Sequence, residues 1–345
     1  MSFASNAVIA KAKAVCGHSL KPEDYTQLAA KESVADVCAY LKQTERYGKA
    51  LSSVNAQTVH RGQLEAILRK SMFDIFERFH TFDQTESRMF FKYIVMQLEI
   101  EQILSALQSV ASGVSMNYIA ALPVFLTEHS QVDLAALGLA GSFMEAAAVL
   151  QGTVYEKTVS PALIEAQSSG SLNICDIERR LYTEYYMKML KNVEKSHKGA
   201  EKKELKRLIF GVIDMKNVVT LYRYARLFGS GTQGAKDALI PFKRRLSDDA
   251  IERLAAQSDI SKIAAELDDM GYGLHSQDIP ATVEILTDKI SMDHLKKLLR
   301  LSQSSSVVYF AFMELMGVEF KNIKTIIEGI RYGLDGGAIL EMLVV

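Results

Sequence analysis

The stretch EFKNIKTIIEGI, residues 319–330, decides the fold class. Its apolar side chains recur at the three- and four-residue spacing of an amphipathic helix: Phe320, Ile323, Ile326, Ile327 and Ile330. The same period occurs in residues 62–80 and again in residues 205–215. Because the chain shows no convincing run of alternating strands and turns, the sequence predicts an all-α fold.

The beginning of this stretch is one of three copies of a short pattern. An acid, an apolar residue, a charged residue, an amide and a β-branched apolar residue occur in that order from Glu99, Asp214 and Glu319. A second pattern, a leucine followed five or six residues later by a tyrosine, occurs in phase with the first, with its tyrosines at Tyr47, Tyr155 and Tyr272. The two patterns predict three similar helical units, at residues 1–113, 114–229 and 230–345.

The acid and the amide of the first pattern are three residues apart and therefore share one helical face. The amides are Gln102, Asn217 and Asn322. The favoured interpretation is a repeated structural hydrogen bond to a buried loop. The alternative interpretation is a pseudo-threefold ring of ligand contacts.

Helix ends are also predicted by local signals. Pro22 indicates a helix start, and the pairs Ser33 with Asp36 and Ser130 with Asp133 resemble capping boxes. Glycines that indicate helix stops are Gly17, Gly113, Gly229, Gly231, Gly333, Gly336 and Gly337.

Composition and charge exclude several classes of protein. The chain has 345 residues, 48% of them hydrophobic, and only 5 prolines, which favours an ordered protein with long helices. A formal net charge of -1 provides no global field to attract nucleic acid or anionic lipid. No apolar run reaches the roughly 18 uncharged residues of a membrane span.

The cysteines and the first residues favour a reducing, cytosol-facing compartment. Cys16, Cys38 and Cys175 are scattered and odd in number, so they predict no disulfide framework. Lys11 and Lys13 interrupt the apolar residues near the start, which is not the order of a secretory signal.

Catalytic and metal-binding patterns are weak. Two Glu-x-x-His pairs, Glu77 with His80 and Glu194 with His197, raise the alternative of a helical di-metal carboxylate enzyme. Lysines surround the second pair, which opposes cation binding. The glycine-rich residues 229–236 lack the Gly-Lys-Ser/Thr of a phosphate loop and predict a linker. The sequence therefore predicts no catalytic residue, no cofactor and no metal.

One segment has an uneven charge. Residues 188–207 contain eight Lys or Arg and three Asp or Glu. A solvated helix end is the favoured interpretation; the alternative is a surface for an acidic protein or anionic lipid, joined by aromatic side chains at 182, 185 and 186. Candidate partner-binding residues are Lys202, Lys203 and Arg207.

Several segments resemble one known family. The stretches AKAKA at 10–14, SLKPEDY at 19–25, SVADV at 33–37, YLKQT at 40–44 and FKNIKTII at 320–327 are similar to the C subunit of A/V-type ATPases, the counterpart of the d subunit of the vacuolar enzyme. The similarity runs essentially from end to end. The chain differs from the family in having lysines at 11 and 13 where arginines are usual, and in lacking the tyrosine that usually precedes Asn6.

This resemblance implies a non-catalytic, funnel-shaped protein of three helical units around a pseudo-threefold axis. It implies a position on the cytoplasmic side of the membrane, as a peripheral part of a rotary ATPase. The implied partners are the membrane proteolipid rotor ring and the central shaft subunits D and F, with torque passing between them. It implies no nucleic acid, no direct nucleotide binding and no transmembrane segment. The alternative function is an all-α scaffold for soluble protein partners.

Overall fold

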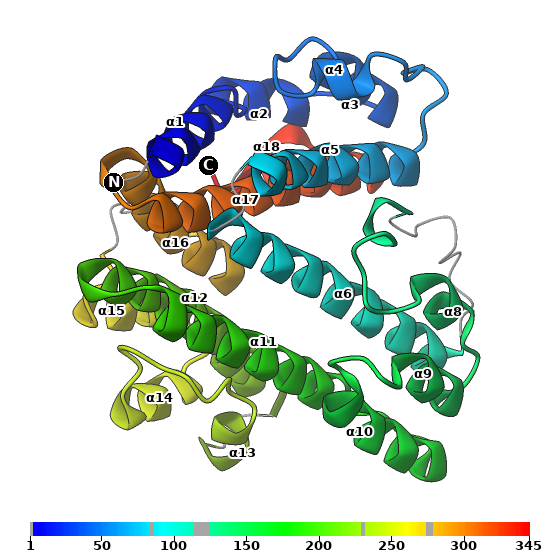
Figure 1. The fold of residues 1–345 in the computed structure, drawn as a ribbon, viewed down its shortest axis with the longest axis vertical. Helices are drawn as coiled ribbons and strands as arrows, with labels where there is room; N and C mark the ends of the chain where they lie inside the picture. The colour runs from blue at the N-terminus through cyan, green and yellow to red at the C-terminus, as the bar shows by residue number, and fades with distance from the viewer. Residues whose placement is uncertain (1–2, 83–85, 114–123, 229–231, 274–278) are drawn as a thin grey trace. The chain divides into compact units, whose positions relative to one another are not determined.

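The computed structural model describes residues 3–82, 86–113, 124–228, 232–273 and 279–345, and every regular element within them is a helix. This confirms the predicted all-α class (Figure 1). The elements are α1 (Phe3–Gly17), α2 (Pro22–Ala29), α3 (Val34–Leu41), α4 (Gly48–Leu51), α5 (Arg61–Phe82), α6 (Glu86–Ser112), the 3-10 turn η1 (Val124–Leu126), α8 (Leu134–Leu139), α9 (Phe143–Leu150), α10 (Glu156–Ser169), α11 (Ile174–Ser196), α12 (Gly199–Phe228), α13 (Thr232–Asp237), α14 (Asp248–Ala255), α15 (Ile260–Asp269), α16 (Val283–Leu301), α17 (Ser305–Arg331) and α18 (Gly336–Glu341).

The three helices predicted from periodicity are present. Residues 62–80 lie in α5, residues 205–215 in α12 and residues 319–330 in α17. The apolar stripe of the last is buried, with Ile323, Ile326 and Ile327 fully inaccessible to solvent. Burial of such side chains stabilises the fold by roughly 1.5–3 kcal/mol each.

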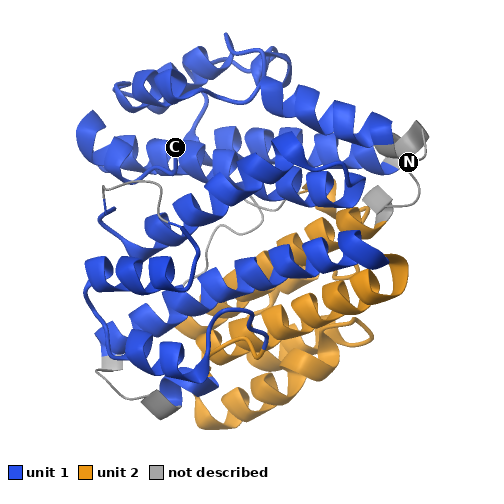
Figure 2. Ribbon diagram, turned by 90° about the vertical axis from the view of Figure 1, so that its left-hand side faces the viewer, with its two compact units in different colours: residues 1–87, 198–237, 242–345 blue, residues 88–197, 238–241 orange. Residues whose placement is uncertain are grey.

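The chain divides into two compact units, which Figure 2 shows in two colours. Unit 1 comprises residues 1–87, 198–237 and 242–345, and unit 2 comprises residues 88–197 and 238–241. The three-unit division at residues 113 and 229 stays a prediction. Residues 114–123 and 229–231, including the predicted stops Gly229 and Gly231, lie outside the described residues.

Helix α17 is the central element of unit 1. Helices α1, α5 and α16 pack against it, as Figure 1 shows for the segment from orange to red. In its first half the rings of Phe79 and Tyr309 lie 5.3 Å apart, edge to face, and those of Phe79 and Phe312 lie 5.1 Å apart. In its second half the core is shared with α2, α3, α4, α5 and α18 and is fully buried at Leu28, Leu41, Leu51, Leu64, Ile323, Ile326, Ile327, Ile339 and Leu343.

Unit 2 is built on α6, α9, α10 and α11. Helix α10 packs against α9 and α11. An aromatic cluster joins α6 to α11, with the rings of Tyr93 and Tyr185 5.7 Å apart and those of Tyr185 and Tyr186 4.9 Å apart. Asn192 donates a hydrogen bond of 2.7 Å to the Tyr93 hydroxyl. Tyr185 and Tyr186 are buried, so these two rings belong to the core and do not join the alternative basic surface.

The same order of elements occurs three times along the chain. Each copy has two short helices, then a tyrosine, then two long helices, and an acid lies in the second long helix. The copies are α2, α3, Tyr47, α5 and α6 with Glu99; α8, α9, Tyr155, α11 and α12 with Asp214; and α14, α15, Tyr272, α16 and α17 with Glu319. Additional short helices, α4 and α10, follow the first two tyrosines.

The predicted helix ends are partly right. Pro22 is the first residue of α2, and the Ser33 hydroxyl accepts the backbone N–H of Asp36 at 3.1 Å. The pair Ser130 with Asp133 is not a capping box, because Asp133 is itself the N-cap of α8 and accepts the N–H of Ala136. Gly333 ends α17 with a φ of 69°, whereas Gly336 and Gly337 begin α18.

Candidate functional site

The carboxylate of Glu319 on α17 is the first of three buried acids that organise the structure. Only 5% of its side chain is exposed. It accepts hydrogen bonds from the Tyr47 hydroxyl at 2.6 Å and the Leu20 backbone N–H at 3.0 Å. It also pairs with the Arg46 guanidinium, where Nε lies 3.2 Å from Oε1. Burial, followed by the charge of Glu319, raises the pKa of Tyr47 well above 10, so the hydroxyl remains a donor.

The carboxylate of Glu99 on α6 has an equivalent set of partners within unit 2. It accepts hydrogen bonds from the Tyr155 hydroxyl at 2.5 Å, the Gln131 backbone N–H at 2.6 Å and the Ser130 hydroxyl at 2.9 Å. Ser130 therefore donates a hydrogen bond to this buried acid, and Asp133 caps α8. Burial and the Glu99 charge raise the pKa of Tyr155 far above its ordinary value.

The carboxylate of Asp214 on α12 completes the set. It accepts the backbone N–H groups of Arg244 at 3.1 Å and Arg245 at 2.9 Å, together with the hydroxyl of Tyr272. Burial raises the pKa of Asp214, although each of these hydrogen bonds acts in the opposite direction.

The acids of the first repeated pattern thus bind the tyrosines of the second. In every case the acid bonds the tyrosine of a different copy and an N–H of the loop before a short helix. Of the amides, Asn322 donates to the Val344 carbonyl at 2.7 Å and accepts its N–H at 3.0 Å, and Asn217 donates to the Phe242 carbonyl at 3.5 Å. Asn322 and Asn217 thus make the structural hydrogen bonds that the favoured interpretation predicts. No such bond of Gln102 is found in the described part of the chain.

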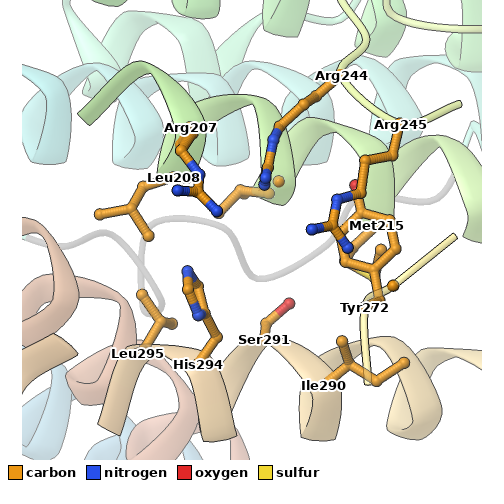
Figure 3. A pocket seen from close by; sticks show the side chains of 13 residues that line it. Arg207, Leu208, Met215, Arg244, Arg245, Tyr272, Ile290, Ser291, His294 and Leu295 are labelled. Carbon is orange, nitrogen blue, oxygen red and sulfur yellow. The ribbon is translucent and has the colours of Figure 1, made fainter. Parts of the chain in front are cut away.

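A cationic pocket lies directly beyond Asp214 in unit 1. Its volume is about 90 Å³, and residues of α12, α16 and the segments around residues 245 and 272 line it. Figure 3 shows the guanidinium groups of Arg207 and Arg244 extending toward each other and toward the imidazole of His294. The described lining residues include no carboxylate; the polar ones are Arg207, Arg244, Arg245, Tyr272, Ser291 and His294.

Several cations line this pocket and no described lining residue is a carboxylate, although Asp214 acts on Arg244 from outside the lining. Burial lowers the pKa of Arg244, and Arg245 and Arg207 lower it further, against the opposing effect of Asp214. Partial burial and then Arg207 lower the pKa of His294 below 6.5, and Arg244, Lys297 and Arg245 act in the same direction. The charged form of Arg244 is thus disfavoured by burial and by its neighbours, and the His294 imidazole tends toward its neutral form.

Arg245 is held in place by the protein itself. Its Nη1 donates to the Met270 carbonyl at 2.8 Å, and its guanidinium lies over the Tyr272 ring, 5.0 Å from the centroid. Gly271 has a φ of 76°, and a Cβ there would lie 2.8 Å from the Arg245 guanidinium. Only glycine allows this close approach without strain.

The sequence-predicted partner residues are only partly brought to this pocket. Lys202, Lys203 and Arg207 all lie near the beginning of α12, where Lys203 and Arg207 are exposed and Lys202 is half-buried. Among them only Arg207 lines the pocket. Sequence reasoning missed Arg244, Arg245 and His294. The one sequence feature that could have indicated the pocket is the pair of adjacent arginines, Arg244 and Arg245, shortly before helix α14 of the third copy.

The two Glu-x-x-His pairs belong to different units. Glu77 and His80 lie on α5 of unit 1, and Glu194 and His197 lie at the end of α11 in unit 2. In the described ranges no three His, Cys, Asp or Glu side chains come together in a way that could hold a metal ion. Residues 229–231 of the predicted linker lie outside those ranges, and the remainder is not a linker but part of the short helix α13, where Lys236 donates to Glu252 at 2.7 Å.

None of the helices in the described segments has both the length and the hydrophobicity needed to cross a bilayer. The fold and these clusters define an all-helical protein whose repeated polar groups bind the protein's own loops.

Comparison with known proteins identifies the family. The model of the family described as ATP synthase (C/AC39) subunit matches residues 8–342. The C subunit of the A-type ATP synthase of Pyrococcus furiosus is 24% identical over 264 residues, which cover 76% of this chain and 67% of the relative. The C subunit of the A-type ATP synthase of Thermococcus gammatolerans is 24% identical over 262 residues, covering 74% and 67%. The chain belongs to this family of C subunits of A/V-type ATP synthases, which are non-catalytic parts of the complex.

Proposed function

We propose that this protein is the central-stalk socket of a rotary ATPase, linking the membrane proteolipid rotor ring to shaft subunits D and F. In this role it transmits torque between ATP chemistry and proton or sodium movement, as a peripheral protein on the cytoplasmic side. The observation that carries the proposal is the family match, which extends over residues 8–342.

A socket that transmits torque must resist deformation, and the repeated acid–tyrosine pairs provide a physical basis for stiffness. Each pair fixes a loop and a tyrosine to the middle of a long helix. Helix α12 has 30 residues, corresponding to about 45 Å, and α17 has 27. We further propose that the three copies surround a pseudo-threefold axis and form the funnel that receives the shaft.

The test is a pull-down of the tagged full-length chain from detergent-solubilised membranes, with identification of the proteins that copurify. The proposal predicts recovery of the proteolipid ring together with D and F. It also predicts no ATP hydrolysis by the isolated chain. Recovery of soluble partners alone would contradict the socket and favour a general helical scaffold.

A second experiment addresses which surface receives a partner. We propose that the basic beginning of α12 contributes, so the double change Lys202→Glu with Lys203→Glu should weaken assembly with the shaft. Arg207→Glu is measured separately because Arg207 also lines the pocket. The matched control reverses two exposed lysines elsewhere, Lys49 and Lys324. Equal assembly by the double variant and this control would remove the surface from consideration.

A further inference from the structure

The cationic pocket contains arginine side chains that, among the described residues, hold no part of the fold together. Neither Arg207 nor Arg244 makes a side-chain hydrogen bond or ion pair in the described part of the chain, although their guanidinium groups face each other. Arg244 is half-buried, whereas Arg207 and His294 are exposed, so water screens part of their mutual repulsion and the remainder raises the free energy of the empty pocket. A bound anion would remove this cost.

The donors converge from three separate segments. Arg207 comes from α12 and His294 from α16, while Arg244 comes from the loop before α14. That loop is fixed, because the backbone N–H groups of Arg244 and Arg245 both donate to Asp214. The Asp214 carboxylate accepts hydrogen bonds from these groups and from Tyr272, and it binds neither the Arg207 nor the Arg244 side chain among the described contacts. The backbone that carries Arg244 is therefore in place before any ligand arrives.

The number and direction of the donors favour phosphate over a carboxylate. A carboxylate is planar and is matched by one guanidinium fork, whereas a tetrahedral phosphate presents oxygens to donors on several sides. The volume of about 90 Å³ accommodates a few waters or one small oxyanion. It is far below the 300–1,000 Å³ typical of sites for larger ligands such as a whole nucleotide.

We propose that this pocket binds a single phosphate group, with Arg207 and Arg244 as its principal ligands and His294 as a third donor. The Ser291 hydroxyl donates to the Thr287 carbonyl at 2.8 Å and is not needed as a donor. Arg245 contributes charge from its position over Tyr272. This site does not depend on the proposed rotary role, and a failed pull-down would leave it standing.

The first test is titration of the full-length chain with inorganic phosphate by calorimetry at pH 7 and constant ionic strength. Saturable binding with one site per chain is expected. Arg244→Gln and Arg207→Gln should each weaken it at least tenfold. Lys203→Gln is the control, because Lys203 is exposed on the same helix and does not line the pocket. No saturable binding, or equal loss in the control, would overturn the proposal.

A second variant tests the pocket without removing charge. Gly211 lines the pocket, and a Cβ at this position has no neighbour within 4 Å, so Gly211→Met should fill the cavity while the helix remains intact. Phosphate binding should fall at least tenfold. Gly317→Met on α17 is the control, because Gly317 is exposed and a Cβ there also meets nothing within 4 Å. Undiminished binding by Gly211→Met would exclude the pocket as the site.

Two further arms identify the source of the phosphate group. Flotation with phosphatidylcholine vesicles that contain phosphatidic acid, compared with phosphatidylcholine alone, reports a lipid headgroup. Binding to these vesicles that requires Arg244 would assign the headgroup as the source, and calorimetric binding alone would assign free phosphate. Titration with acetate and with a short polyglutamate peptide covers the carboxylate case. Pocket-dependent binding of either of these, with none of phosphate, would overturn the assignment.

Discussion

The buried carboxylates show how single residues hold this structure together. Removing a charged carboxylate from water costs several kcal/mol unless donors replace the lost hydration. Glu319 has three donors of different kinds, namely a tyrosine hydroxyl, a backbone N–H and the guanidinium of Arg46, whose side chain is also only 5% exposed. Replacing one partner therefore leaves another buried polar group unsatisfied.

This reasoning predicts a graded loss of stability around Glu319. Glu319→Ala should reduce the free energy of unfolding by roughly 3–5 kcal/mol, because the buried Arg46 guanidinium loses its counter-ion. Tyr47→Phe should cost about 1–2 kcal/mol, because one of three donors is lost. Urea denaturation of each variant provides the measurement. A Glu319→Ala variant as stable as Tyr47→Phe would contradict the prediction.

The second residue-scale prediction concerns pH. Glu314 on α17 is half-buried, and burial raises its pKa from 4.5 to about 7, with Asp288 of α16 adding to the rise and Lys216 of α12 opposing it. Between these pH values the folded state binds more protons than the unfolded state. Stability therefore falls as pH rises through this window, and the full penalty is present above pH 7.

Glu314→Gln should remove this penalty. We expect the variant to be more stable than the parent by roughly 1–3 kcal/mol at pH 8 and close to it near pH 4.5. Thermal unfolding across that range provides the measurement. Glu341→Gln, at an exposed carboxylate of α18, is the matched control. A gain that does not depend on pH, or equal gains in both variants, would show that titration of Glu314 is not the cause.

At the scale of elements, periodicity predicted the long helices well because their buried faces are wide and continuous. Local signals were less reliable. Ser130 and Asp133 are both acceptable N-caps, and only the tertiary contact of Ser130 with Glu99 distinguishes them. The glycines at 336 and 337 suggested a stop, yet Asp335 caps a new helix there by accepting the N–H of Ala338 at 3.0 Å.

Two glycines within α17 provide an element-scale prediction. A Cβ at Gly329 would lie 2.7 Å from Cγ1 of Ile339 on α18, whereas a Cβ at Gly317 has no neighbour within 4 Å. Gly317→Ala should stabilise the protein by about 0.5–1 kcal/mol through helix propensity. Gly329→Ala should instead destabilise it by roughly 1–3 kcal/mol, because overpacking exceeds that gain. Chemical denaturation would contradict this explanation if the two changes had the same sign.

At the scale of the whole molecule, the sequence revealed repetition but not the way in which the copies are joined. The acids and the tyrosines were recognisable because they recur in phase. Their pairing was not, since Tyr47 and Glu319 are 272 residues apart and no local pattern specifies such a contact. Arg244 and His294 were missed for the same reason: their separate segments meet only in the folded unit. Contacts of this range also cost loop-closure entropy during folding.

The final prediction follows from the joining of distant segments in unit 1. Helix α18 packs against α2 and α17, and Ile339 and Leu343 are fully buried in the core shared with Leu28 and Leu41. Removal of residues 336–345 would expose that core and break both hydrogen bonds between Asn322 and Val344. Hydrogen exchange should therefore accelerate in α2 and α3, at the other end of the sequence, while α11 of unit 2 remains protected.

Point variants separate the loss of packing from the loss of chain. Leu343→Ala removes a fully buried side chain and should reproduce the loosening of α2 and α3 at a cost of roughly 2–5 kcal/mol, whereas Met342→Ala, at a side chain 46% exposed, should not. Because both variants retain the backbone bonds of Val344, the comparison isolates the apolar contact. Unchanged exchange in α2 after Leu343→Ala would mean that the N-terminal helices are stable without α18. The Tyr47–Glu319 contact and the packing of α1 and α5 against α17 would then be sufficient to join the first and the last segment.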